Sequence, residues 1–152
     1  MSRDEGCVGY KIERTDEKNR AKQKARIAKR RKKNKLRVAT WNVRSLKQNG
    51  KLENVIQEME RMEVDVMGIS ETFFKDDFKK QVGLSDSKSN YILINAGSDD
   101  NRKGVAFIYK GKLEKNYESH QCVSNRIILL KLKTKPRKTT FIQVYAPTED
   151  AD

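Results

Sequence analysis

The sequence is poor in residues on which several protein classes depend. Its two cysteines, Cys7 and Cys122, stand far apart, so we expect free thiols rather than a disulfide framework or a zinc site. Its one histidine, His120, lies in SHQCV, which is typical of a surface or loop residue rather than a catalytic base. No apolar run reaches the roughly 18 residues of a membrane span, and the start lacks a signal peptide's apolar core. We expect no membrane span and no secretion.

Apolar residues are also few for a chain of this length. They make up 36% of the 152 residues, and charged residues make up another 36%. Residues 1–35 carry 14 basic and 5 acidic side chains, a net charge of +9, which leaves +4 of the total +13 for residues 36–152. We therefore expect a basic arm over residues 1–35, largely disordered or helical, and one folded region over residues 36–152.

The arm ends in the basic run AKRRKKNK. Such a run neutralises phosphates and gives salt-sensitive, sequence-blind affinity for nucleic acid, and it also resembles a nuclear-localisation signal. The alternative is a tail that only keeps the protein soluble. Charge alone does not separate DNA from RNA. We expect a nuclear protein, or otherwise a cytoplasmic one, whose candidate nucleic-acid contacts in the arm are Lys29, Arg30, Arg31, Lys32, Lys33 and Lys35.

Beyond residue 35 the pattern predicts one helix among short strands. LRVATW (36–41) and VDVMGIS (64–70) are apolar enough for buried strands, and KLENVIQEMERM (51–62) between them has apolar residues at helical spacing. The turn TKPRK joins the last two expected strands as a hairpin. The further strands expected are 91–95, 104–109, 125–133 and 139–147.

Polar side chains follow the first two strands. A strand joined to the next through one helix is most simply parallel to it, so both strands end at the same edge of the sheet. Asn42 follows the first strand and Glu71 the second, and we expect these side chains to converge. Glu71 would then be an oxygen ligand for a hard cation, with Asn42 positioning it or the substrate. The alternative is a glutamate that simply caps the turn into TFFKDDF.

The stretches ATWNVRSL, GISET, GVAFIY and VYAPT occur in this order over residues 36–148. Together they resemble the endonuclease/exonuclease/phosphatase superfamily, which has the deoxyribonuclease I-like fold. The sequences of these motifs are most similar to those of the endonucleases of RTE-type non-LTR retrotransposons and of the craniofacial development protein 2-like proteins derived from them. The resemblance implies an α/β fold, the first half of a four-layer α/β sandwich with a mixed sheet and one main helix.

The resemblance also implies a reaction, the hydrolysis of DNA phosphodiesters with Mg²⁺, or alternatively Mn²⁺, and no small-molecule cofactor. Carried over by motif, Asn42 joins the hydrogen-bond network and the metal site, Glu71 is the main metal ligand, and Tyr145 contacts the scissile phosphate. Arg44 stands where the abasic-site enzymes carry an acidic residue. This departure favours nicking of target DNA over abasic-site repair and makes Arg44 a further candidate nucleic-acid contact.

The family's later Gly-Asp-Phe-Asn-like and Ser-Asp-His-like motifs do not occur in the 152 residues. We therefore expect a truncated domain that is inactive by itself and exposes an apolar sheet face for a partner to cover. Three readings stay open. The chain is a truncated endonuclease, a nucleic-acid-binding module that uses its basic arm, or an adaptor whose exposed sheet face binds another subunit.

Overall fold

The computed structural model describes residues 17–27, 35–84, 90–100 and 102–146. The chain divides into two compact units, Met1–Lys35 and Leu36–Asp152, and each is described by itself. In the first unit, residues 17–27 form a helix whose residues are all exposed. Good helix formers such as lysine, arginine and alanine dominate this stretch, so propensity rather than packing favours the helix. The basic residues from Lys29 to Lys33 lie outside the described residues.

Five strands of the second unit form a mixed sheet in the order β1-β2-β5-β4-β3. Strands β1 and β2 run parallel and are connected through helix α2, as the strand–helix–strand pattern predicts. The other pairings in this sheet are antiparallel. The bounds of these elements are β1 Val38–Asn42, α2 Lys51–Arg61, β2 Val66–Ser70, β3 Phe78–Gly83, β4 Asn90–Ala96 and β5 Val105–Lys110.

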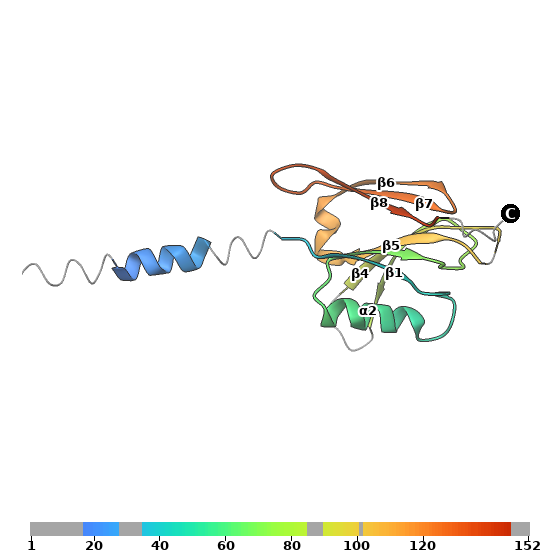
Figure 1. Ribbon diagram of the computed structural model, residues 1–152, viewed down its shortest axis with the longest axis horizontal. Helices are drawn as coiled ribbons and strands as arrows, with labels where there is room; N and C mark the ends of the chain where they lie inside the picture. The colour runs from blue at the N-terminus through green and yellow to red at the C-terminus, as the bar shows by residue number, and fades with distance from the viewer. Residues whose placement is uncertain (1–16, 28–34, 85–89, 101, 147–152) are drawn as a thin grey trace, which may run out of the picture. The chain divides into compact units, whose positions relative to one another are not determined.

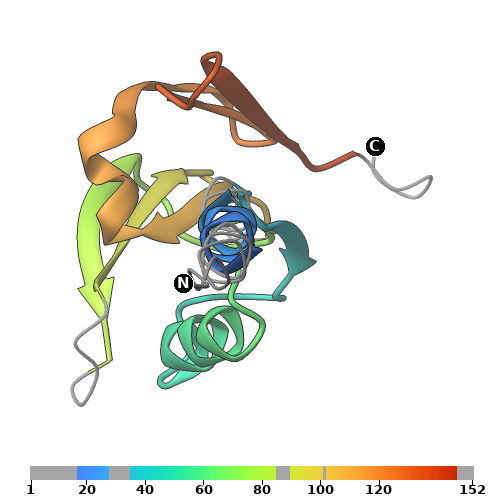
Figure 2. The same cartoon turned by 90° about the vertical axis from the view of Figure 1, so that its left-hand side faces the viewer.

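A second, three-stranded antiparallel sheet follows in the order β6-β7-β8. Its elements are the 3-10 helix η1 Gly111–Asn116 and the strands β6 Tyr117–Ser124, β7 Ile127–Leu132 and β8 Thr139–Val144. Figure 1 shows α2 on one side of the five-stranded sheet and the three-stranded sheet on the other, and Figure 2 shows these layers in the view turned by 90°. The expected fold class, an α/β sandwich with a mixed sheet and one main helix, is confirmed.

Two cores hold the layers together, one on each face of the five-stranded sheet. Residues of α2, including Ile56 and Met59, pack against alternate residues of β2 such as Ile69. On the other face, Leu130 and its neighbours on β7 pack against residues such as Phe107. Because β2 is covered on both faces, all its residues are buried, which explains its continuous apolar sequence. Each large apolar side chain buried in these cores, such as Ile69, stabilises the fold by roughly 1.5–3 kcal/mol relative to exposure.

The pattern of apolar residues did not predict strands β3 and β6. Most residues of β3 are exposed, and β6 carries polar side chains along its length, so neither stretch reads as a buried strand. The expectation for His120 was wrong in one respect, since it lies half-buried in β6 rather than in a loop, with its Nδ1 2.7 Å from the hydroxyl of Tyr117. Outer strands tolerate such polar residues because one face meets solvent.

An apolar patch is exposed on the three-stranded sheet. Ile142 and Val144 of β8 are 60% and 54% exposed, and Val123 of β6 is 50% exposed. Gln143, between Ile142 and Val144, is buried. Because side chains alternate along a strand, Ile142 and Val144 point away from the sandwich. An exposed apolar sheet face is therefore present as expected, and a partner that covers it stays a prediction.

Asp65 ties the start of β2 to its neighbours. Its carboxylate accepts a hydrogen bond from the Arg37 N–H at 3.1 Å and pairs with the ammonium groups of Lys110 and Lys112, both at 3.1 Å. Burial by itself would raise the pKa of Asp65, but these donors and positive charges outweigh it and lower that pKa. Along the described stretches of the chain, no helix is long and apolar enough to cross a membrane.

Candidate active site

Three residues from three separate motifs meet at one carboxylate oxygen. Asn42 ends β1, Glu71 directly follows β2, and Tyr145 directly follows β8 in the other sheet. The amide Nδ2 of Asn42 donates a hydrogen bond to Glu71 Oε1 at 2.6 Å, and the Tyr145 hydroxyl donates to the same oxygen at 2.9 Å. The convergence expected for Asn42 and Glu71 is present, and Tyr145 reaches the same place across the sandwich.

The loops that follow β1 and β2 have an unusual backbone. Arg44, Ser45, Glu71 and Phe73 have φ angles of 48°, 90°, 61° and 63°, in the left-handed region that non-glycine residues rarely adopt. Each such residue costs on the order of 1–2 kcal/mol, so the surrounding contacts must compensate. The Ser45 N–H donates to the Glu71 carbonyl at 2.7 Å, and the Leu46 N–H donates to that of Thr72 at 3.0 Å. The two loops therefore hold each other in register.

Arg126 holds Tyr145 from the turn between β6 and β7. The Tyr145 N–H donates to the Arg126 carbonyl at 2.9 Å, and the guanidinium lies 5.3 Å from the centre of the Tyr145 ring. The hydrogen bond to Glu71, burial and the negative charge of Glu71 raise the pKa of Tyr145, and the charge of Arg126 opposes them. Tyr145 is thus protonated at neutral pH and acts as a hydrogen-bond donor.

The donor set at this site suits a hydrated cation rather than a closed metal cage. Within the described residues, no group of three or more His, Cys, Asp or Glu side chains gathers as a metal site. Both hydrogen bonds to Glu71 end on Oε1, which leaves Oε2 as the oxygen that could reach a cation. Asn42 Oδ1 accepts the Arg44 N–H at 3.2 Å. Mg²⁺ keeps several waters and is often bound through only one or two carboxylates, so Glu71 fits this role.

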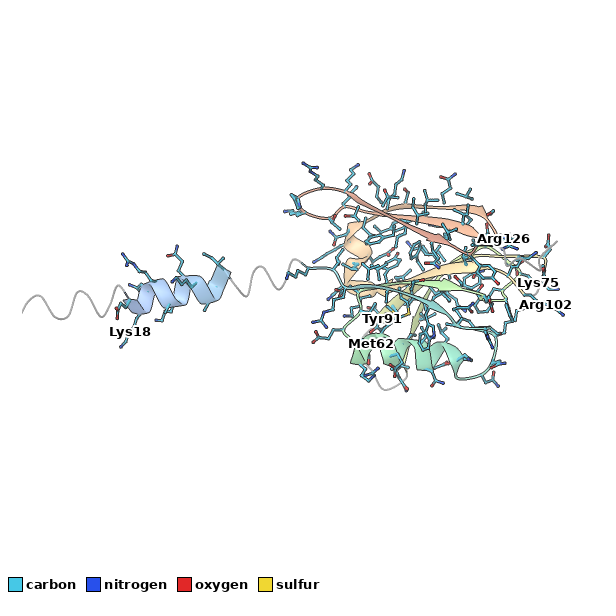
Figure 3. The ribbon with its side chains drawn as sticks, viewed as in Figure 1. Lys18, Met62, Lys75, Tyr91, Arg102 and Arg126 are labelled. Atoms are coloured by element: carbon cyan, nitrogen blue, oxygen red, sulfur yellow. The ribbon has the colours of Figure 1, made fainter. Side chains whose placement is uncertain are left out.

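Several positive side chains lie at the end of the sandwich where the site stands. Figure 3 shows Arg126, Lys75 and Arg102 at the same end of the molecule. Arg44 is exposed in the loop after β1, beside the site, as a nucleic-acid contact requires. Lys35 is exposed as well and belongs to the first unit. The remaining expected contacts of the arm lie outside the described residues.

Two residues near the site were not found by sequence reasoning. Arg126 had no signal beyond its charge, because only the sheet topology brings the β6–β7 turn to Tyr145. Gln143 lies in the strand that leads to Tyr145 and is 8% exposed. The sequence did indicate its side of the strand, because Gln143 stands two residues before Tyr145 and residues two apart on a strand share a face.

Neither the histidine nor the described cysteine belongs to the site. His120 pairs with Tyr117 in β6, and burial together with the charge of Lys79 lowers the pKa of His120. Cys122 is a half-buried free thiol as expected, and burial raises its pKa to about 11. Cys7 lies outside the described residues.

Comparisons with known proteins give one clear similarity. No protein-family model matches the chain. Over 115 residues, 76% of the chain, the sequence is 36% identical to craniofacial development protein 2 of Bos taurus and, to the same extent, to that of Tragulus javanicus. The chain is homologous to craniofacial development protein 2 over this stretch. The match covers 18% and 19% of these relatives, so the chain spans about a fifth of their length.

Proposed function

We propose that the site at Glu71 takes part in metal-dependent hydrolysis of DNA phosphodiesters, as in retrotransposon-derived members of the endonuclease/exonuclease/phosphatase superfamily. The observation that carries this proposal is the meeting of Asn42, Glu71 and Tyr145 on one carboxylate oxygen, at 2.6 and 2.9 Å. These residues come from the WN, SET and VYAP motifs, which are distant in the sequence. Homology to craniofacial development protein 2 supports the same family assignment.

Each residue has a role in this proposal. Glu71 would hold Mg²⁺ or Mn²⁺, whose chemistry is to stabilise the charge that develops on a phosphate under attack. Asn42 fixes the rotation of the Glu71 carboxylate through its hydrogen bond. Tyr145, kept protonated, donates its single hydroxyl hydrogen to Glu71 Oε1 in this structure, and it would turn this hydrogen to a phosphate oxygen when DNA binds. Arg126, stacked on the Tyr145 ring, adds a positive charge beside that oxygen.

We further propose that this chain alone cleaves DNA very slowly. Hydrolysis of a phosphodiester also needs a base that takes a proton from the attacking water. In the described residues no histidine or second carboxylate bonds to Glu71, and His120 is engaged with Tyr117. Catalytic groups act as a unit, so a metal-holding carboxylate without a base gives little acceleration.

Metal binding is the direct test of the Glu71 assignment. Mn²⁺ is a paramagnetic substitute for Mg²⁺ at oxygen sites, and it broadens NMR signals of nearby nuclei. We expect Mn²⁺ to broaden the signals of Asn42 and Thr72 in the native chain. Glu71→Gln should lower the affinity for Mn²⁺ at least tenfold, which is about 1.4 kcal/mol. The matched control is Glu63→Gln, which changes an exposed glutamate in the turn after α2. Equal broadening in both variants would refute the assignment.

Plasmid nicking in Mg²⁺ tests the reaction. We expect the native chain to nick supercoiled DNA no faster than its Glu71→Gln variant. Robust nicking that depends on Glu71 would support the hydrolase and overturn the proposed inactivity. Nicking that is fast in both proteins would point to a contaminating nuclease.

A second candidate function, non-catalytic nucleic-acid binding, is favoured by the charge of the arm. Residues 1–35 carry a net +9, and the helix over residues 17–27 is exposed along its whole length. This function predicts binding to duplex DNA that falls steeply with salt. Deletion of residues 18–35 would abolish it, whereas Glu71→Ala would leave it unchanged. Both functions are compatible in one chain, because the arm would bind DNA while the Glu71 site would act on its phosphodiesters. The same arm would favour nuclear localisation.

A further inference from the structure

A buried amide links the two sheets beside the site. Gln143 of β8 is 8% exposed and lies between the sheets. Its Oε1 accepts a hydrogen bond from the Thr40 hydroxyl of β1 at 3.1 Å, and its Nε2 donates to the Ser70 hydroxyl of β2 at 2.9 Å. One side chain therefore joins three strands, two from one sheet and one from the other.

The opposite strand leaves room for this amide. A Cβ atom on Gly68 would lie 2.0 Å from Gln143 Oε1 and 2.8 Å from its Cδ, far inside contact distance. The φ of Gly68 lies outside the left-handed range, so no turn requires a glycine there. The glycine is explained by the close approach of the Gln143 side chain to the backbone of β2.

This link lies next to Glu71 and Tyr145, the two residues that would bind the metal and the phosphate. Gln143 and Tyr145 are two residues apart and face the same side of the chain, toward the five-stranded sheet. Ser70, which the amide binds, directly precedes Glu71. Strand β8 is an edge strand that pairs only with β7 within its sheet, so contacts across the sandwich decide how far it stands from β2.

We propose that Gln143 is a positioning residue, which sets the separation of β8 from β2 and so keeps the Tyr145 hydroxyl on the Glu71 carboxylate. Gly68 and Thr40 serve the same purpose, the one by making room for the amide and the other by orienting it. The inference rests on the proposed function, because the position of Tyr145 matters only if its hydroxyl contacts a phosphate beside the metal that Glu71 would hold. The contacts themselves need neither metal nor DNA.

The test follows the environment of Tyr145 directly. The full chain is labelled with 3-fluorotyrosine, and the Tyr145→Phe variant identifies the ¹⁹F signal of residue 145. We expect Gln143→Met, which keeps the shape of the side chain but loses both hydrogen bonds, to move this signal toward its value in the unfolded chain. The signals of the other tyrosines stay in place. The control is Ile142→Gln on the same strand, which faces outward and leaves the signal of residue 145 unchanged.

Two milder variants decide the matter if Gln143→Met does not fold. Gly68→Ala should displace the amide and move the same signal, and it should have no further effect when Gln143 is already alanine. Thr40→Val removes one hydrogen bond and should give a smaller shift in the same direction. A signal of residue 145 that stays in place in both variants, with the other tyrosine signals native, overturns the proposal. Because no metal is added, a failure of Mn²⁺ binding or nicking bears on the proposed function and leaves this result standing.

Discussion

The left-handed backbone at Glu71 predicts how a glycine would behave there. A non-glycine residue at φ 61° costs on the order of 1–2 kcal/mol, which a glycine avoids. Part of this gain is lost because glycine is freer in the unfolded chain, so the net gain is about 1 kcal/mol. Glu71→Gly also removes two hydrogen bonds to a carboxylate. In this half-exposed place each of these is worth about 0.5–1 kcal/mol. We expect Glu71→Gly to range from unchanged to about 1 kcal/mol less stable.

Glu63 offers a matched control with the same residue type and nearly the same backbone. Its φ is 56°, and its carboxylate makes an ion pair with Arg37 at 2.8 Å, with both side chains more than half exposed. Such an exposed pair contributes at most about 0.5 kcal/mol. Glu63→Gly should therefore stabilise the protein by about 0.5–1 kcal/mol. The two variants should differ in free energy of unfolding by about 0.5–2 kcal/mol, and only the contacts of Glu71 explain the difference.

Urea unfolding of both variants measures this difference. Trp41, the single tryptophan, lies in β1 beside Asn42 and reports the unfolding of this sheet by fluorescence, and far-UV circular dichroism checks it independently. If Glu71→Gly gains as much stability as Glu63→Gly, the hydrogen bonds of Asn42 and Tyr145 to the carboxylate contribute nothing. If Glu63→Gly gains nothing, the left-handed backbone is not a source of strain.

Four further outcomes follow from the structure. Replacing the exposed Ile142 and Val144 by threonine should lower the binding of a hydrophobic dye while changing the free energy of unfolding by less than about 0.5 kcal/mol, and an unchanged dye signal would place the apolar surface elsewhere. The pKa of Asp65 is lowered on folding, so its contribution to stability is present above the unfolded pKa of about 4 and is lost as the pH falls through the folded pKa. Asp65→Asn should therefore reduce the loss of unfolding free energy that the native chain shows at acid pH. Arg126→Gln should weaken binding of a short DNA duplex by the whole chain without unfolding it, as anisotropy and circular dichroism would report. Deleting residues 18–35 should abolish measurable binding to duplex DNA, and binding that persists with an unchanged slope of log affinity against log salt would assign the phosphate contacts to the folded unit.

The inner strands and the helix were predictable from sequence because burial leaves a pattern. A helix that covers one sheet face repeats its apolar residues at helical spacing, and a strand covered on both faces is apolar throughout, as α2 and β2 are. Strands β3 and β6 lie at the edges of their sheets, where exposure allows polar residues and removes the pattern. The periodicity of apolar residues therefore found the centre of the fold and missed two of its edges. The expectation that residues 36–41 form a buried strand was wrong, because β1 lies at the edge of the five-stranded sheet and most of its residues are exposed.

The candidate site was predictable to different degrees. Parallel strands that end at one sheet edge were enough to bring Asn42 and Glu71 together. Tyr145 belongs to the other sheet, and no local pattern says that this sheet folds back over the first, so only the motif resemblance connected it with Glu71. Arg126 and Gln143 were missed for the same reason, since Arg126 contacts Tyr145 from a turn and Gln143 bonds across to the other sheet.

The left-handed turn at Glu71 explains how the carboxylate reaches these partners. Val66, Gly68 and Ser70 of β2 face the three-stranded sheet, as the contacts of Val66 and of Gln143 indicate, while Met67 and Ile69 face α2. In a continued strand, side chains alternate, and residue 71 would point toward α2. A positive φ at residue 71 breaks this alternation, and its carboxylate meets Asn42 and Tyr145, which both lie on the side of the three-stranded sheet. The strain at Glu71 is thus the conformational cost of placing an acidic group between the sheets, and a glycine at this position would keep the turn while losing the group that the turn presents.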